Sequence, residues 1–245
     1  MNGASGAALK LSGDTVIKTC KGAKQQVQWF QHANQIGLPE GLSVPQIYRT
    51  EELYYEMEYI QGHEATHEAT LYGIKACLKW CLHCEHKPSK AEGSWDSYLV
   101  RLEDHVRLAD TAPMRLALQK VGQLKPLPPS FNHGDLTLEN VLITPGSVVL
   151  IDPNYDPSLF QSYILDLGKV LQSTHFNYHR VFDSNHGVNL KRHGKWIEAK
   201  LRANGLWEQS LLSCLSHIIR LRKYQPIEKQ SGVDFHLASF INSYT

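Results

Sequence analysis

Long apolar runs are absent from this sequence. Its longest uninterrupted aliphatic stretch is Val148-Val149-Leu150-Ile151, far short of the roughly 20 apolar residues that a helix needs to cross a bilayer. The first residues also lack the basic start and the apolar centre of a secretory signal. We therefore expect a protein that has no membrane partner and works in the cytoplasm.

A surplus of positive charge is absent as well. The 245 residues include 25 Lys and Arg against 24 Asp and Glu, which gives a net charge of +1. Because affinity for a phosphate backbone needs a clustered positive surface, this balance argues against a nucleic-acid partner. Hydrophobic residues make up 42% and charged residues 20% of the chain, which leaves a globular enzyme or binding module. The sequence specifies no oligomeric state.

Cysteines are few, and their odd number, five, argues against a disulfide-bonded scaffold. Three of them, Cys77, Cys81 and Cys84, lie near His83 and His86, and such a cluster raises the question of a zinc site. The three cysteines recur at i, i+4 and i+7, which places them on one face of a helix. A zinc site usually takes some of its four ligands from a second element. The spacing therefore favours a buried helix face, because a buried Cys behaves as a small apolar residue.

The distribution of β-branched residues and turn signals divides the chain into a β-rich part and a helical part. The β-rich part has expected strands at 7–11, 15–20, 45–48 and 53–60 and one helix at 23–36. The helical part has expected helices at 67–86, 94–109, 158–174, 193–203 and 206–223, a short terminal helix, and a hairpin at 141–152. The sequence therefore predicts an α+β fold, with a small β-rich N-terminal lobe over residues 1–60 and a larger helical C-terminal lobe over residues 61–245.

One constellation of polar residues carries chemistry: His133-Gly134-Asp135, followed by Asn140 and Asp152. An aspartate on a loop can orient a hydroxyl group and accept its proton, while we expect His133 to orient the loop. The hairpin after Asn140 reverses the chain and returns Asp152 close to it. Amide and carboxylate oxygens suit Mg²⁺, which proteins usually hold through one or two side chains together with substrate phosphates. The pattern predicts metal-assisted phosphoryl transfer, with Asp135 acting on the acceptor hydroxyl.

The segment from His133 to Leu142 resembles the catalytic loop of the aminoglycoside phosphotransferase and choline kinase family, and Asp152 resembles that family's metal-binding aspartate. The resemblance implies a protein-kinase-like fold and an ATP-dependent kinase that phosphorylates a hydroxyl group of a small-molecule acceptor. It implies ATP and Mg²⁺ as cofactors, Asp135 as the catalytic residue, and Asn140 and Asp152 as the metal ligands.

The same resemblance assigns nucleotide-binding residues to the first 60 positions. Lys18 lies on the second expected strand, where the family has the lysine that holds the phosphates. The other nucleotide contacts that it implies are Ser5 and Gly6, in a turn over the phosphates, and Met57, Glu58 and Tyr59, in a hinge whose backbone reads the adenine. Further along the chain, Asp166 resembles an aspartate that braces the catalytic loop from the start of a helix, which is a structural role.

Two positions depart from the family pattern, and one of them is Pro153, which follows Asp152 where a Phe or Gly is commoner. The other concerns the partner of Lys18. The helix after the lysine strand normally carries a Glu that pairs with the lysine, but no Asp or Glu occurs between Thr19 and Pro39. Three glutamines of this helix remain as neutral hydrogen-bond partners for Lys18, namely Gln25, Gln26 and Gln28.

Because the Glu that pairs with the lysine is missing, an alternative function stays open: the protein could be a pseudokinase that binds nucleotide and acts through protein partners. Retention of Asp135, Asn140 and Asp152 favours catalysis. Protein kinase activity is disfavoured, because no Ala-Pro-Glu segment follows Asp152. The basic residues after Asp156 favour a sugar or sugar-like metabolite as the acceptor over an amino alcohol or an aminoglycoside.

Overall fold

The computed structural model describes residues 7–66, 70–178, 190–223 and 225–244. The chain divides into two compact units. The first unit consists of Met1–His83 and His133–Pro157, and the second of Cys84–Asn132 and Ser158–Thr245. The hairpin that carries the expected metal ligands thus belongs to the same unit as the N-terminal strands. The lobe boundary at residue 60 stays a prediction.

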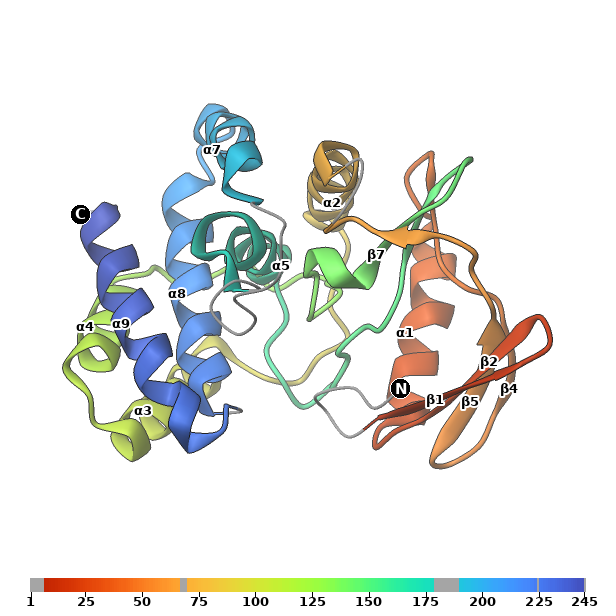
Figure 1. Ribbon diagram of the computed structural model, residues 1–245, viewed down its shortest axis with the longest axis horizontal. Coiled ribbons are helices and arrows are strands. Elements are labelled where there is room, and N and C mark those ends of the chain that lie inside the picture. The colour runs from red at the N-terminus through yellow and green to blue at the C-terminus, as the bar shows by residue number, and fades with distance from the viewer. Residues whose placement is uncertain (1–6, 67–69, 179–189, 224, 245) are drawn as a thin grey trace. The chain divides into compact units, whose positions relative to one another are not determined.

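A four-stranded antiparallel sheet forms the N-terminal part of the first unit (Figure 1). Its strands, in the order in which they pair, are β1 (Ala8–Ser12), β2 (Thr15–Thr19), β5 (Tyr54–Glu58) and β4 (Ile47–Thr50). Gly13 takes a positive φ of 60° in the turn between β1 and β2, a conformation that glycine adopts at little cost. The predicted hairpin at the start of the chain is confirmed.

Helix α1 (Ala23–Ile36) packs against β4 and β5 (Figure 1). Its buried apolar positions include Ala23, Val27, Phe30 and Ala33, a spacing of three to four residues that forms one helix face. The Phe30 ring meets the Tyr55 ring of β5, with centroids 6.2 Å apart. This contact fixes the rotation of α1 about its axis and thus decides which of its glutamines face the sheet.

A second, smaller sheet joins the two chain segments of the first unit. Its order is β3 (Leu42–Ser43), β8 (Val148–Leu150), β7 (Val141–Ile143) and β6 (His63–Glu64). The β7–β8 hairpin was expected, whereas the two-residue strands β3 and β6 were not, because two residues show no period. Helix α2 (Thr70–Cys84) follows β6. Cys77, Cys81 and Cys84 are buried on it and none of them is in a disulfide, which confirms the predicted helix face.

The second unit is helical. Its α-helices, within the part of the chain that the structure describes, are α3 (Trp95–Ala109), α4 (Ala112–Val121), α5 (Tyr163–Leu171), α7 (Gly194–Ala203), α8 (Trp207–Lys223) and α9 (Ile227–Ser243). Helix α8 contacts each of the other five (Figure 1). Gly168 of α5 allows a close approach to α8, because a Cβ atom there would lie 2.7 Å from the Cβ of Ser213. No described helix is both long and apolar enough to cross a membrane.

Two helical predictions differ from the structure. The helix expected over 158–174 begins only at Tyr163, after Ser162 caps it, and continues beyond Leu171 as the π-helical turn η2 (Gln172–Phe176). The terminal helix was expected to be short, but α9 has 17 residues. Its buried residues recur at helical spacing across much of that length and make it part of the core of the second unit. The α+β class, with β-rich N-terminal and helical C-terminal parts, is confirmed.

Candidate active site

The loop that carries the His-Gly-Asp motif lies against the loop that follows β8. Gly134 has a φ of 82°, and a Cβ atom at this position would lie 2.1 Å from the backbone oxygen of Asn154. The backbone N–H of Asn154 donates to the carbonyl of His133 over 3.0 Å. Only glycine satisfies both the left-handed backbone and this approach, which explains the residue at the centre of the motif.

His133 holds this loop from inside the first unit. Its ring is completely buried and meets the Trp29 ring edge to face, with centroids 5.0 Å apart. Nε2 donates to the carbonyl of Ile151 over 3.0 Å, and Nδ1 accepts from the backbone N–H of Asp135 over 3.4 Å. Burial lowers the pKa of His133 to about 4, although the carboxylates of Asp135 and Asp152 oppose the shift. At neutral pH the imidazole is therefore uncharged, and its contacts fit the predicted orienting role.

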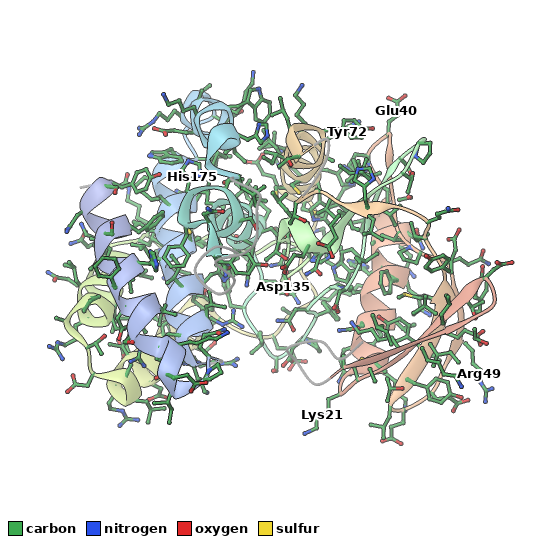
Figure 2. All side chains as sticks on the ribbon, in the orientation of Figure 1. Lys21, Glu40, Arg49, Tyr72, Asp135 and His175 are labelled. Carbon is green, nitrogen blue, oxygen red and sulfur yellow. The ribbon has the colours of Figure 1, made fainter. Side chains whose placement is uncertain are left out.

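Asp135 (Figure 2) is joined to Asn140, which closes the short helix η1 (Leu138–Asn140). Nδ2 of Asn140 donates to the backbone oxygen of Asp135 over 2.8 Å and to its Oδ2 over 3.3 Å. Since both bonds use the amide nitrogen, the amide oxygen of Asn140 is left to accept from another group. The backbone oxygen of Asn140 accepts from the N–H of Ile151 over 3.0 Å, which brings Asn140 next to the residue that precedes Asp152.

Asp152 and Lys18 form an ion pair, although 134 positions separate them in the sequence. Lys18 extends from β2 and is almost fully buried, whereas 45% of the Asp152 side chain is exposed. Asp152 has a φ of 54°, a left-handed conformation that is uncommon outside glycine, asparagine and aspartate. The structure therefore brings together the two residues assigned to phosphate binding and to metal binding.

Gln26 is the glutamine that reaches this pair. Its Nε2 donates to Oδ1 of Asp152 over 3.4 Å, and its Oε1 accepts from the Tyr55 hydroxyl over 2.9 Å and from the Cys20 thiol over 3.7 Å. Burial, followed by the charge of Asp152, raises the pKa of Tyr55 above its usual value, so its hydroxyl stays a donor. The amide of Gln26 thus contacts Asp152, not Lys18 as expected, and the other two candidates, Gln25 and Gln28, are exposed.

An apolar surface lies beside Lys18 on the same face of the sheet. The strand register pairs Leu9 with Lys18, Leu11 with Val16, and Val16 with Met57, and cross-strand partners point to the same face of a sheet. Leu9 and Leu11 are 45% and 59% exposed. Such a strip can accept a flat aromatic ring next to the ammonium group.

The residues assigned to the hinge lie at the end of β5. The N–H of Glu58 donates to the carbonyl of Gln46 over 2.9 Å, and the N–H of Tyr59 donates to the carbonyl of Asp14 over 3.0 Å. These two donors are therefore engaged in the sheet, and adenine recognition by the backbone of Met57, Glu58 and Tyr59 stays a prediction. Ser5 and Gly6 lie outside the described residues.

The donor set suits a magnesium ion. Asn140 offers an amide oxygen and Asp152 a half-exposed carboxylate, and both are hard ligands of the kind that Mg²⁺ prefers. The described residues contain no cluster of three His, Cys, Asp or Glu side chains that could hold a metal. A cation at this place would therefore have two protein side chains as ligands, and phosphate oxygens and water would supply the others.

The sequence singled out Asp166 but neither Trp29 nor Tyr55. Asp166 is buried in the first turn of α5, where a helix N-terminus stabilises a carboxylate; its bracing role stays a prediction. Trp29 and Tyr55, which hold His133 and Gln26, were missed. The sequence places Tyr55 on an expected strand, whereas its pairing with the strand of Lys18 is visible only in the structure.

Several solved structures share this fold. An aminoglycoside phosphotransferase, APH(4)-Ia, in a complex with AMP-PNP and hygromycin B is 11% identical over 98% of this chain and 94% of its own, with a TM-score of 0.66. A choline/ethanolamine kinase family protein from Mesorhizobium loti is 14% identical over 96% and 83%, with a TM-score of 0.61. A possible fructosamine-3-kinase from Thermobifida fusca is 18% identical over 96% and 93%, with a TM-score of 0.56. No curated protein sequence matches the chain significantly.

A family model decides the assignment. The model of the phosphotransferase enzyme family, APH, matches residues 13–185, which is well over half of the chain. The matched segment contains Lys18, Asp135, Asn140 and Asp152. It confirms the prediction of an enzyme, a small-molecule kinase, and the protein-kinase-like fold agrees with it. The chain therefore belongs to the phosphotransferase enzyme family, as the motif around Asp135 predicted.

Proposed function

We propose that this phosphotransferase uses ATP and Mg²⁺ to transfer the γ-phosphoryl group to a hydroxyl of a small molecule. The observation that carries the proposal is a continuous set of contacts within the first unit. Asp135 is bonded to Asn140, the Asn140 backbone is bonded to Ile151, and the adjacent Asp152 is paired with Lys18. Base, metal ligands and phosphate-binding lysine are thus connected by direct bonds.

In this proposal the four polar side chains have different roles in the reaction. Asp135 orients the acceptor hydroxyl and takes its proton while the new O–P bond forms and the bond from the γ-phosphorus to the leaving ADP oxygen breaks. Lys18 binds the nucleotide phosphates. Asn140 and Asp152 hold Mg²⁺, which neutralises charge on the phosphate oxygens. Because the transition state of phosphoryl transfer is loose, alignment and charge neutralisation supply most of the catalysis.

The acceptor class is proposed to be a sugar or a sugar-like metabolite, with amino alcohols and aminoglycosides as alternatives. Two of the proteins with this fold are a glucosamine kinase and a possible fructosamine-3-kinase, and both names refer to sugar derivatives. The basic residues after Asp156 support this preference less than expected. Arg202 pairs with Glu198, and Arg222 pairs with Asp234, so these two cations are already neutralised.

The test is release of ADP from MgATP in the presence of sugars, amino alcohols and aminoglycosides, after a thermal-shift screen has selected ligands that stabilise the fold. We expect ADP release that depends on one acceptor class and on Mg²⁺. Absence of nucleotide binding would contradict the proposal.

A nucleotide-binding pseudokinase that acts through protein partners is the second candidate. Gln26 favours it, because the position that faces Asp152 on α1 carries no charge. Tight binding of MgATP without turnover for any acceptor in the panel would select this candidate.

A further inference from the structure

Asp152 is the charged partner of Lys18 as well as a proposed metal ligand. Lys18 is only 3% exposed, and a buried ammonium group is costly unless a negative charge compensates it. Within the described residues, its ion pair is with Asp152, while the α1 residue that contacts Asp152 is the neutral Gln26. The same carboxylate therefore has to serve Lys18 in the absence of a metal and the cation in its presence.

Gln26 is held in an orientation that reinforces this pair. The Tyr55 hydroxyl and the Cys20 thiol both donate to its Oε1, which leaves Nε2 directed at Asp152, 3.4 Å away. A carboxylate accepts hydrogen bonds and does not donate them, so only the amide nitrogen can face it. Asp152 thus has two donors, one charged and one neutral.

We propose that Gln26 is a positioning residue that increases the dependence of metal binding at Asp152 on bound nucleotide. The inference rests on the proposed function. Lys18 and a divalent cation compete for one carboxylate, because position 26 offers Lys18 no alternative negative charge. Anionic phosphates draw Lys18 away from Asp152 and release the carboxylate to the cation. A negative charge at position 26 gives Lys18 a second partner and reduces this dependence.

The experiment measures Mn²⁺ binding to the full chain by electron paramagnetic resonance, with and without the ATP analogue AMP-PNP. In the unmodified chain we expect AMP-PNP to tighten Mn²⁺ binding about tenfold or more, which corresponds to about 1.4 kcal/mol. In Gln26→Glu we expect Mn²⁺ alone to bind about tenfold more tightly than in the unmodified chain, with a correspondingly smaller effect of AMP-PNP.

Matched controls come from the same helix. Gln25→Glu and Gln28→Glu add the same charge at exposed positions of α1, and exposed charges interact weakly. Both should leave Mn²⁺ affinity within about threefold of the unmodified chain. Lys18→Met provides an independent test that does not alter position 26. It removes the competing cation, so Mn²⁺ alone should again bind about tenfold more tightly.

The outcomes separate the inference from the function on which it rests. Binding of Mn²⁺ and AMP-PNP without mutual dependence would overturn the coupling and leave the proposed kinase function intact. Equal Mn²⁺ affinity of Gln26→Glu and Gln25→Glu would show that position 26 has no special role. If Gln26→Glu does not fold, unchanged Mn²⁺ affinity in Lys18→Met overturns the competition by itself. An unmodified chain that binds neither probe would refute the proposed function.

Discussion

Single side chains explain most of the chemistry that this fold offers. Asp135 keeps its place because Asn140 donates to both its backbone and its carboxylate. The same bonds turn the amide oxygen of Asn140 toward other ligands. Asn140 therefore holds the proposed base through its amide nitrogen and is a proposed metal ligand through its amide oxygen. A change in the position of Asn140 should affect both sites.

Replacement of Asp135 tests the base directly. Asp135→Asn keeps an oxygen that can accept from Asn140 but removes the proton acceptor, so kcat should fall about 100-fold or more. Nucleotide affinity should stay unchanged, because Lys18 and Asp152 are intact. Steady-state ADP release and nucleotide titration measure the two quantities. Asp104→Asn, on the exposed side of α3, is the control, and wild-type turnover in Asp135→Asn would contradict the assignment.

Buried His133 predicts a loss of stability in acid. An unfolded histidine has a pKa near 6.5, whereas the pKa in the fold is about 4. As the pH falls from 6.5 to 4, the unfolded state binds a proton that the folded state does not, so the free energy of unfolding decreases by roughly 3 kcal/mol in total. Below the folded pKa the loss levels off.

Denaturant unfolding of the chain between pH 7 and pH 4 measures this effect. His133→Gln retains a donor for the Ile151 carbonyl and removes the titration, so its free energy of unfolding should fall less steeply with decreasing pH than that of the unmodified chain. His86→Gln, at an exposed position, should keep the original slope. Identical slopes for all three proteins would show that His133 is not buried in the neutral form.

Two glycines, Gly134 in the motif loop and Gly168 in α5, lie where a Cβ atom would be too close to a neighbouring residue. Gly134→Ala places a Cβ atom 2.1 Å from the Asn154 backbone and retains a φ of 82°, so we expect a loss of about 3 kcal/mol or more and an inactive loop. Gly13→Ala also has a positive φ, 60°, but no atom within 4 Å, and should lose only about 1 kcal/mol. Thermal unfolding of both variants measures the difference, which isolates the loop contact, and equal losses would contradict it.

The packing of α5 on α8 gives a second glycine test. Gly168→Ala brings a Cβ atom to 2.7 Å from Ser213, and overpacking of this kind costs about 1–3 kcal/mol. Gly232→Ala, in α9 with open space around it, should instead stabilise the chain by up to about 1 kcal/mol through helix propensity. Chemical denaturation should give shifts of opposite sign, and two stabilised variants would mean that α5 and α8 are farther apart.

Local signals in the sequence found the motif loop and its hairpin, because each lies within a short window around Asp135 and Asp152. The sequence could not show which glutamine contacts Asp152. Gln25, Gln26 and Gln28 are equal candidates until tertiary contacts, such as that between Phe30 and Tyr55, set the rotation of α1 about its axis. The strands β3 and β6 gave no pattern, since two residues pair only when tertiary contacts bring them to β8 and β7.

At the scale of the whole molecule, the first unit is incomplete without residues 133–157. Leu42 pairs with Val148, and Glu64 with Leu142, so β3 and β6 of the early segment find their partners only in the later one. A fragment of residues 1–83 should therefore show no cooperative thermal transition by circular dichroism, whereas the full chain should show one. A fragment that melts cooperatively would mean that the first sheet and α1 suffice.

This interrupted arrangement has a consequence during synthesis. The ribosome has to add 67 residues between His83 and Leu150 before the last partner strand exists, which takes roughly 3–13 s at common elongation rates of about 5–20 residues per second. Until His133 has been added, Trp29 lacks the imidazole that later packs against it, and until Leu150 has been added, an edge that β7 or β8 will occupy is open. During this stage the nascent protein exposes an aromatic ring and unpaired strand edges, which are the kinds of surface that chaperones bind.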